Sequence, residues 1–244
     1  MTRDLSIIVP TFNEEERIIK CLIRLSVIFP REIIVVDNGS SDNTKMIVGR
    51  LIKLGVFRDT DLRLIQMPKP GKGAAVRMGM ILSRGAYCYM ADCDLSTPAS
   101  AILDFLIFMR NYKADVVLGS RRMPGSKVKQ SARRAFSAKI FHAFTSLLLP
   151  EIHDTQCGFK LFSRQAAQDI FSKTRLDGLA FDVEVILEAK QLGYKVMEMP
   201  VPWDESSRSS VHLVRDGMKM TRDLFSLARR YRFKRAAQLR PSLP

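Results

Sequence analysis

The sequence predicts an α/β fold in which a mostly parallel, twisted sheet carries helices on both faces. The first observation is that short apolar runs alternate with segments of helical periodicity through the first half of the chain. The second is that polar clusters follow three of the apolar runs, at residues 10–16, 37–44 and 92–97. Ligands of such sheets bind beyond the carboxyl ends of the strands. We therefore expect a binding site where these clusters meet.

Each predicted element follows from its local pattern. Five apolar runs of β-type composition, each too short for a typical helix, predict strands. They are Leu5–Val9, Glu32–Val36, Leu62–Gln66, Ala86–Ala91 and Asp115–Gly119. Four segments of helical periodicity lie between them. They are Glu14–Val27, Asp42–Leu54, Gly73–Leu82 and Pro98–Arg110.

The pattern changes after Gly119. A basic loop at residues 120–130 precedes an amphipathic segment at 132–149, whose last ten residues are uncharged and apolar. This apolar part is either a packed core helix or a helix that contacts lipid. The stretch 212–233 mixes apolar residues with arginine and lysine, which is typical of a helix on an anionic membrane surface. We expect one domain over 1–211 and a basic amphipathic extension over 212–244.

The net charge of +14 is concentrated in two segments. Residues 121–139 hold seven Lys or Arg and no acid, and residues 215–240 hold nine against two acids. Such basicity indicates a polyanionic partner: nucleic acid, an anionic membrane or a phosphorylated substrate. The plain alternative is a solvated basic face.

Several features bear on the compartment. No apolar run approaches the roughly 18–20 residues that a membrane-spanning helix needs. The first apolar stretch is too short for the hydrophobic region of a secretory signal. The four cysteines show no Cys-x-x-Cys pair. We therefore expect a cytoplasmic protein with reduced thiols, attached peripherally to the cytoplasmic face of a membrane.

Asp92-Cys93-Asp94, at the end of a buried strand, is the most informative short motif. Two carboxylates at such a position are costly unless a cation lies beside them. Hard oxygen ligands at a strand end suit Mg²⁺ or Mn²⁺, which leave room for phosphate oxygens. The motif therefore predicts a metal–nucleotide site.

Five separated motifs together resemble the inverting family 2 glycosyltransferases. In chain order they occupy residues 9–15, 35–44, 71–75, 92–96 and 154–162. The last of these, Asp-Thr-Gln-Cys-Gly-Phe-Lys-Leu-Phe, is similar to the polyprenyl-phosphate glycosyltransferases. With the segment 180–184, the chain most resembles the dolichyl-phosphate glucosyltransferases within that group. The resemblance covers roughly residues 5–215.

The resemblance implies a GT-A fold, a divalent metal and a nucleotide-sugar donor, with UDP-glucose favoured over GDP-mannose. It places Pro10 and Glu14 in the first nucleotide-contacting loop and Asp37 at the N–H edge of the base. Lys72 takes a position near the base or the phosphates. Asp94 and Asp92 become the metal ligands, and Asp92 is also placed beside the ribose. The flanking Gly71 and Gly73 would let the backbone approach a ligand closely.

The implied acceptor is a polyprenyl phosphate, and its chemistry sets what the enzyme must supply. A phosphate monoester with a second pKa near 6 is already largely dianionic at neutral pH, so it must be held rather than deprotonated. Arginine suits this role because its fork matches phosphate oxygens. The resemblance assigns it to Arg121, Arg133 and Arg134. It also carries over Asp154, Gln156 and Asp182 as active-site positions beside Asp94 and Arg121.

One position departs from the family pattern. Relatives carry a basic residue seven positions after a strand-end tryptophan, and here Ser210 follows Trp203 at that distance. Arg208 is the nearest basic residue and could bind the acceptor phosphate in its place.

Other functions remain open from the sequence. A GDP-mannose-dependent dolichyl-phosphate mannosyltransferase would keep the fold and the mechanism, and so would a family member with a soluble acceptor. The basic and apolar stretch at 121–149 argues against a small soluble acceptor. A nucleic-acid-binding module would use the two basic segments, but it leaves the Asp-x-Asp strand end unexplained. We therefore expect no nucleic-acid partner.

Overall fold

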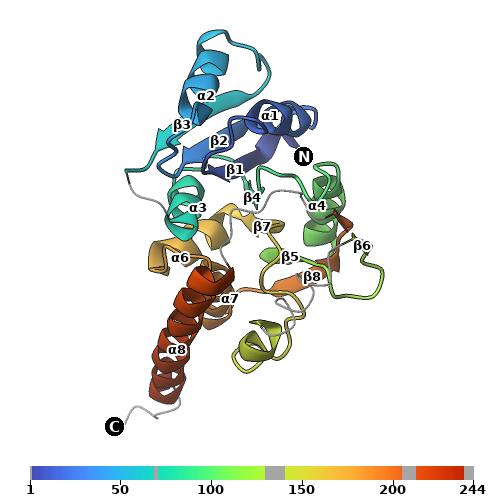
Figure 1. Cartoon of the computed structure of the whole chain (residues 1–244). Coiled ribbons are helices and arrows are strands. Elements are labelled where there is room, and N and C mark those ends of the chain that lie inside the picture. Colours follow the sequence, from blue (N-terminus) through green and yellow to red (C-terminus); the bar gives the residue numbers. More distant parts are fainter. Residues whose placement is uncertain (1, 69–70, 130–140, 205–212, 239–244) are drawn as a thin grey trace, which may run out of the picture.

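A seven-stranded sheet forms the centre of the protein, as seen in a computed structural model that describes residues 2–68, 71–129, 141–204 and 213–238 (Figure 1). The strands are β1 (Leu5–Thr11), β2 (Glu32–Asp37), β3 (Asp61–Gln66), β4 (Tyr87–Met90), β5 (Val116–Ser120), β7 (Lys160–Ser163) and β8 (Val196–Pro200). Their order in space is β3-β2-β1-β4-β7-β5-β8. All neighbours are parallel except β7, which is antiparallel to both β4 and β5. The predicted mostly parallel sheet is confirmed.

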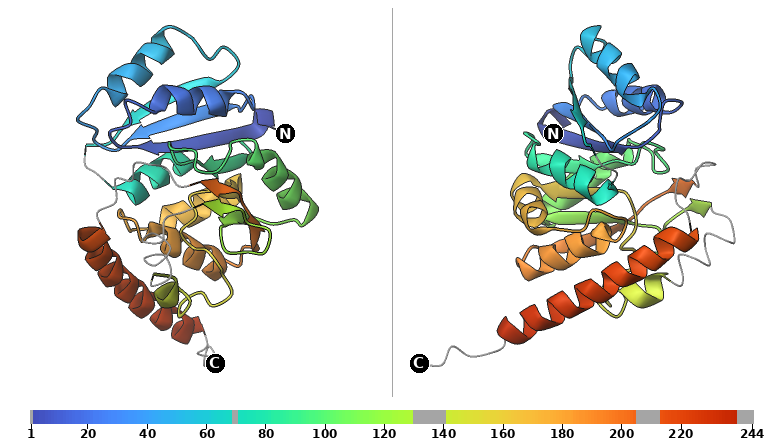
Figure 2. Two further views of the ribbon diagram at one scale, coloured as in Figure 1. Left: turned by 45° about the vertical axis from the view of Figure 1, so that its right-hand side comes forward. Right: turned by 60° about the vertical axis from the view of Figure 1, so that its left-hand side comes forward.

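Helices cover both faces of this sheet (Figures 1 and 2). They are α1 (Ile18–Ser26), α2 (Thr44–Lys53), α3 (Lys72–Ile81), α4 (Ala101–Asn111), α6 (Arg164–Lys173), α7 (Phe181–Gln191) and α8 (Leu213–Gln238), with a 3-10 turn, η1 (Thr2–Asp4), at the start. The helices α1, α2 and α4 pack on one face, and α3, α6 and α7 on the other. A separate pair of short strands, β6 (Val128–Lys129) and β9 (Trp203–Asp204), lies beside the sheet.

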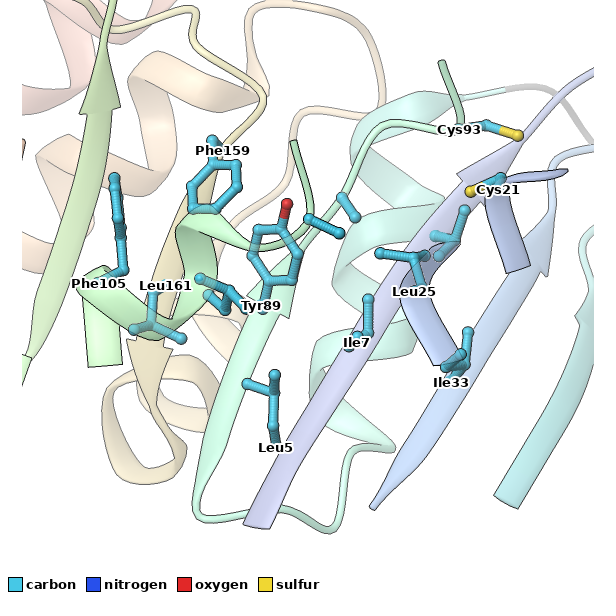
Figure 3. Packing of buried hydrophobic residues seen from close by; sticks show 14 of the residues in the cluster. Leu5, Ile7, Cys21, Leu25, Ile33, Tyr89, Cys93, Phe105, Phe159 and Leu161 are labelled. Carbon is cyan, nitrogen blue, oxygen red and sulfur yellow. The ribbon is translucent and has the colours of Figure 1, made fainter. Parts of the chain in front are cut away.

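The two-residue period of the strands divides the core. In β2, Ile33 and Val35 face the α1–α4 side, whereas Ile34 and Val36 face the α3–α7 side. All four side chains are fully buried, which explains why this strand reads as a continuous apolar run. On the α1–α4 side, the rings of Tyr89 and Phe105 each lie 4.6 Å from the ring of Phe159 (Figure 3). These contacts fix the end of β4 from which the Asp-x-Asp loop leaves.

The predicted elements of the first half all exist, and their ends differ from the predictions by a few residues. The largest difference is α1, which begins at Ile18 because residues 15–17 form turns. The pattern did not reveal β7, α6, α7 and β8 in the second half. In the predicted segment 132–149, residues 141–145 are helical, but 146–148 form a turn. Leu149 is buried in the core and Leu147 is 81% exposed, so the segment carries both core-packed and exposed apolar side chains.

The predicted C-terminal helix is present as α8, which lies along α7 at the edge of the molecule (Figure 2). Leu224 and Leu227 are buried in the core on the α7 side. Phe225 points outward and is 68% exposed. Among the helices that the described residues form, none has the length and apolarity needed to cross a membrane.

Candidate active site at the carboxyl ends of the strands

The Asp-x-Asp motif leaves β4 as a loop in which the middle residue is buried and the two aspartates are not. Cys93 is 6% exposed and sits in the core beside Cys21 of α1 (Figure 3). Asp92 and Asp94 are only partly buried. The loop then turns at Leu95, whose φ of 47° is rare for a bulky side chain and indicates local strain. This turn lets Ser96 N–H donate to Oδ1 of Asp94 at 3.1 Å.

Lys72 provides the cation that the buried strand end requires. It is the first residue of α3, and its Nζ lies 2.7 Å from Oδ1 of Asp92. Burial alone would lower the pKa of Lys72, but Asp92, Asp182 and Asp94 outweigh burial and raise it to about 12. Burial alone would raise the pKa of Asp92, but Lys72 outweighs burial and the pKa falls below its usual value. Both groups are therefore charged at neutral pH.

A second ion pair lies deeper in the protein. Lys160 on β7 is 1% exposed, and its Nζ donates to Oδ1 of Asp182 at 2.5 Å and to the carbonyl of Cys157 at 2.6 Å. Burial raises the pKa of Asp182, and the nearby Lys160 and Lys72 offset this only in part. The two pairs act on each other's charges, so lysines and aspartates form one electrostatic unit around Asp92.

Glycines allow the backbone to pass close to this unit. A Cβ at Gly158 would lie 1.9 Å from Oδ2 of Asp92, so a larger residue there would displace this carboxylate. A Cβ at Gly73 would lie 2.3 Å from the carbonyl oxygen of Leu176. The close approach expected at Gly73 is therefore to the protein's own chain, which the sequence pattern could not distinguish from a ligand.

The carboxylates fit a metal ion that is shared with a substrate. Within the described ranges, no cluster of three or more His, Cys, Asp or Glu side chains could hold a metal by itself. Mg²⁺ and Mn²⁺ commonly take one or two carboxylates and complete their shell with water and substrate phosphates. Asp94 and Asp92 match such a set. Oδ1 of Asp92 faces the cationic Lys72, whereas Oδ1 of Asp94 accepts a neutral backbone N–H, so a metal cation meets less repulsion at Asp94.

Asp37 ends β2 on the same edge of the sheet. Its side chain is fully buried, Oδ2 accepts the Ser40 N–H at 3.1 Å, and Oδ1 has no hydrogen-bond partner among the described residues. A buried carboxylate oxygen left unpaired is costly, so this one is expected to accept from a ligand. The neighbouring Asn38 accepts the Gly71 N–H at 2.6 Å, which ties the Asp37 loop to the start of α3.

Glu14 and Pro10 lie next to this edge. Pro10 is the sixth residue of β1, directly opposite Val36 of β2, and is partly buried. Glu14 receives two hydrogen bonds from Arg17, at 2.7 and 2.9 Å. Burial raises the pKa of Glu14 despite Arg17, and nearby Asp94 adds to the rise. The structure thus brings Glu14 and the Asp-x-Asp loop together, as the resemblance implies.

Arg121 is held tightly by the protein itself. Its Nε and Nη2 donate to the Asp154 carboxylate at 2.6 and 2.9 Å, and its own backbone N–H donates to the same group at 3.0 Å. Burial opposes the charge on Arg121, but Asp154 raises its pKa above the usual value. The guanidinium lies over the ring of Trp203, 5.3 Å from its centre. One edge of the fork is therefore used within the protein, and only the remaining N–H groups can meet a substrate.

Glu198 of β8 fixes the turn that carries Asp154. Its side chain is 6% exposed and accepts the backbone N–H groups of His153 and Asp154 at 2.8 and 3.0 Å. Sequence reasoning missed Glu198, Lys160 and Asn38. A charged residue within the apolar runs at 159–162 and 196–201 was the signal for the first two.

Gln156 belongs to the same turn, where its N–H donates to Oδ1 of Asp154 at 3.1 Å. Its Nε2 is buried without a hydrogen-bond partner among the described residues, so it can donate to a ligand. The predicted phosphate-binding residues Arg133, Arg134 and Arg208 lie outside the described residues.

Sequence comparison identifies relatives of the whole arrangement. A family model described as glycosyl transferase family 2 matches residues 6–171. A dolichyl-phosphate beta-glucosyltransferase of Dictyostelium discoideum is 34% identical over 249 residues, which span 93% of this chain and 74% of that protein. The enzymes of the same name from Saccharomyces cerevisiae and Homo sapiens are 31% and 32% identical, over 93% and 94% of this chain and 75% and 76% of their own.

Structure comparison agrees on the fold. Glucosyl-3-phosphoglycerate synthase of Mycobacterium tuberculosis, in complex with phosphoglyceric acid, superposes with a TM-score of 0.68 at 18% identity, over 92% of this chain and 79% of that one. Its complex with Mn²⁺ and UDP-glucose gives a TM-score of 0.66 at 18% identity, over 94% and 79%. At this identity the likeness establishes the GT-A fold and no more. The chain belongs to glycosyl transferase family 2 and is a glycosyltransferase related to the dolichyl-phosphate beta-glucosyltransferases.

Proposed function

We propose that the protein transfers glucose from UDP-glucose to a polyprenyl phosphate such as dolichyl phosphate, with inversion at the anomeric carbon and with Mg²⁺ or Mn²⁺ bound. The observation that carries this proposal is the gathering of Asp37, Lys72, Asp92 and Asp94 at one edge of the sheet, where one buried oxygen of Asp37 has no hydrogen-bond partner in the described part of the chain. The names of the relatives support the choice of glucose and of dolichyl phosphate.

On the donor side, Oδ1 of Asp37, which has no partner within the described ranges, accepts the N–H of the uracil ring. Pro10 of β1 and Glu14 of the loop that follows it border the nucleotide. Lys72, charged at neutral pH, lies beside the diphosphate and keeps Asp92 in place. A divalent ion held by Asp94 and Asp92 would supply positive charge to the oxygens of the diphosphate leaving group.

On the acceptor side, the lipid phosphate is the nucleophile. One of its oxygens forms a bond to the anomeric carbon while the bond from that carbon to the diphosphate breaks, and UDP leaves with the electron pair. No proton is removed in this step, because the phosphate is already ionised. Arg121, held at a fixed angle by Asp154, and the Gln156 amide contact the phosphate.

We place the enzyme at the cytoplasmic face of a membrane, attached from one side. The outward Phe225 of α8 supports this placement, together with Leu147 and Phe144, which are 81% and 45% exposed. Exposed apolar side chains beside basic segments are the composition of a surface that binds anionic lipid. The other face of α8 is committed to α7, so attachment uses only part of the helix.

The deciding experiment measures transfer of radiolabelled sugar into lipid that can be extracted with organic solvent. Polyprenyl phosphate is the acceptor, UDP-glucose and GDP-mannose are compared, and Mg²⁺ and Mn²⁺ are each added or removed with chelator. We expect glucosyl-lipid that depends on the metal and falls about 1000-fold in Asp94→Ala, since several kcal/mol of charge stabilisation are lost.

Asp104→Ala, the same change on the exposed face of α4, is the control and should leave transfer intact. Mannosyl-lipid in place of glucosyl-lipid would overturn the donor assignment and keep the mechanism. Absence of lipid product with either donor would refute the lipid acceptor, and near-normal transfer by Asp94→Ala would refute the metal site.

A further inference from the structure

A single arginine of α8 reaches two buried carboxylates of α7. Nη1 of Arg230 lies 2.5 Å from Oε1 of Glu184, and Nη2 lies 2.8 Å from Oε1 of Glu188. The same Nη2 donates to the carbonyl oxygen of Lys173 at 3.2 Å, at the end of α6. Glu184 and Glu188 are 0% and 1% exposed. Buried charges of this kind persist only when they are paired, so Arg230 is required by the architecture beneath it.

The second oxygen of Glu184 organises the loop between α6 and α7. Its Oε2 accepts the backbone N–H groups of Arg175 and Leu176 at 2.9 and 2.7 Å. Two successive N–H groups that point at one carboxylate oxygen fix the direction of the chain at that point. The position of the loop at residues 174–180 is therefore tied to the position of Arg230.

This loop is in turn hydrogen-bonded to the start of α3. The carbonyl oxygen of Asp177 accepts the Gly73 N–H at 2.9 Å, and its carboxylate receives Nη2 of Arg77 at 2.5 Å. The loop lies so close that a Cβ at Gly73 would be 2.3 Å from the Leu176 carbonyl oxygen, and one at Gly71 would be 3.0 Å from the Asp177 carbonyl oxygen. Lys72 stands between these two glycines.

The α8 helix also lies close to the loop. A Cβ at Gly178 would lie 3.4 Å from Cε of Lys219 and 3.6 Å from Oδ2 of Asp223. Asp223 is 8% exposed, so this contact belongs to the buried side of α8. Two residues after Ala180, the loop delivers Asp182 to its pair with Lys160. The Lys72–Asp92 pair and the deeper Lys160–Asp182 pair thus both depend on how the 174–180 loop is held.

We propose that Arg230 is a positioning residue for the donor site. Through Glu184 it holds the 174–180 loop, the loop holds the start of α3, and α3 holds Lys72 against Asp92. This role rests on the donor site proposed above and gives α8 a second task besides membrane attachment. Figure 2 shows α8 lying along α7, on the side of the molecule that carries this chain of contacts.

The test compares Arg230→Ala with Arg229→Ala, which removes the same charge from an adjacent, exposed position of the same helix. Amide hydrogen exchange is measured on the whole protein without substrate. In Arg230→Ala we expect exchange at Leu176 and Gly73 to accelerate roughly 10-fold, because each amide loses a fixed acceptor. In Arg229→Ala, exchange at both should match the wild type.

Two more variants keep the proposal open to refutation if Arg230→Ala folds poorly. Arg230→Lys keeps a charge but loses the fork, and Glu184→Gln keeps the side-chain length but weakens the acceptor. Each should accelerate amide exchange at Leu176 and Gly73 less than Arg230→Ala does. A donor KM raised roughly 2- to 30-fold, with the acceptor KM unchanged, is expected for both.

Faster exchange confined to α7 and α8, with Gly73 unaffected, would overturn the proposal. So would a loss of kcat with an unchanged donor KM. Because the exchange measurement needs no substrate, it stands even if the wild-type protein makes no glucosyl-lipid, and failure of the proposed function would be recognised separately.

Discussion

The donor side of the site and its second half treat charge in opposite ways. On the proposed donor side, at the ends of β2 and β4, one oxygen of Asp37 has no hydrogen-bond partner among the residues that the structure describes, and Asp94 remains partly exposed. In the second half, on β5, β7 and α7, the charged groups are paired inside the protein, as in Lys160 with Asp182 and Arg121 with Asp154. The difference separates groups that are left available to a ligand from groups that hold the framework in which the ligand binds.

The largest effect should come from removing a framework charge. Lys160→Met leaves Asp182 buried without its nearest cation, and breaking one partner of a buried pair costs about 3–5 kcal/mol of unfolding free energy. Lys190→Met is the matched control, because Lys190 pairs with Glu151 at the exposed surface, where such a pair is worth about 0–1 kcal/mol. Urea unfolding of both variants measures the difference.

The loss of unfolding free energy in Lys160→Met should also depend on pH. Burial raises the folded-state pKa of Asp182. An ionised Asp182 therefore opposes folding once the pH exceeds the pKa that Asp182 has in the unfolded chain, which is about 4. Without Lys160 the folded-state pKa rises further. The deficit in stability should therefore grow as the pH rises from 4 and shrink below it. A deficit equal at pH 4 and pH 7 would show that Asp182 does not titrate as a buried acid and would break the distinction drawn above.

Arg121 tests whether one side chain can both hold the framework and remain available to a ligand. In Arg121→Lys the ammonium cannot reproduce the two bonds to Asp154 and also face a phosphate. We expect kcat/KM for the lipid acceptor to fall about 10- to 100-fold, the loss of roughly one strong hydrogen bond to a charged group. Steady-state kinetics with each substrate varied in turn should leave the donor KM nearly unchanged. A raised donor KM would mean that the two sides are not separate.

Arg110→Lys, on the exposed face of α4, is the control for that substitution. It should alter neither kcat/KM for the lipid acceptor nor the donor KM. Glu198→Gln offers a milder form of the same test, since Glu198 acts on Arg121 only through the turn that carries Asp154. Its effect should have the same direction as that of Arg121→Lys and a smaller size.

The same distinction explains what the sequence could reveal. The donor side was predictable because each feature is local: an apolar run, then Asp37 or the Asp-x-Asp pair, placed together by the rule for parallel strands. The cation expected beside the Asp-x-Asp pair was a metal ion, and the ion pair of Lys72 with Asp92 was not indicated by any local pattern.

The second half could not be predicted in this way. The helix α7 is buried along almost its whole length, including Glu184 and Glu188, which a pattern of exposed charges would place on the surface. Their partner Arg230 is 46 and 42 residues away in the sequence. Local periodicity carries no record of such a pairing, so the framework charges were visible only in the folded chain.

The smallest expected effect comes from Phe225 of α8, which repeats the contrast with its neighbour Leu224. Leu224 is 6% exposed in the core and Phe225 is 68% exposed, so the first serves the framework and the second is available for the proposed membrane contact. Phe225→Ala should lower binding to anionic liposomes roughly 5- to 10-fold, as expected for partial burial of one aromatic ring, with little change in stability. Leu224→Ala should leave liposome binding nearly unchanged and cost about 2–5 kcal/mol of unfolding free energy. Deleting everything after Asp216 is a poorer test, because it also removes Arg230 and uncovers Glu184 and Glu188. If Phe225→Ala binds liposomes as well as the wild type, the outward face of α8 does not attach the protein to the membrane.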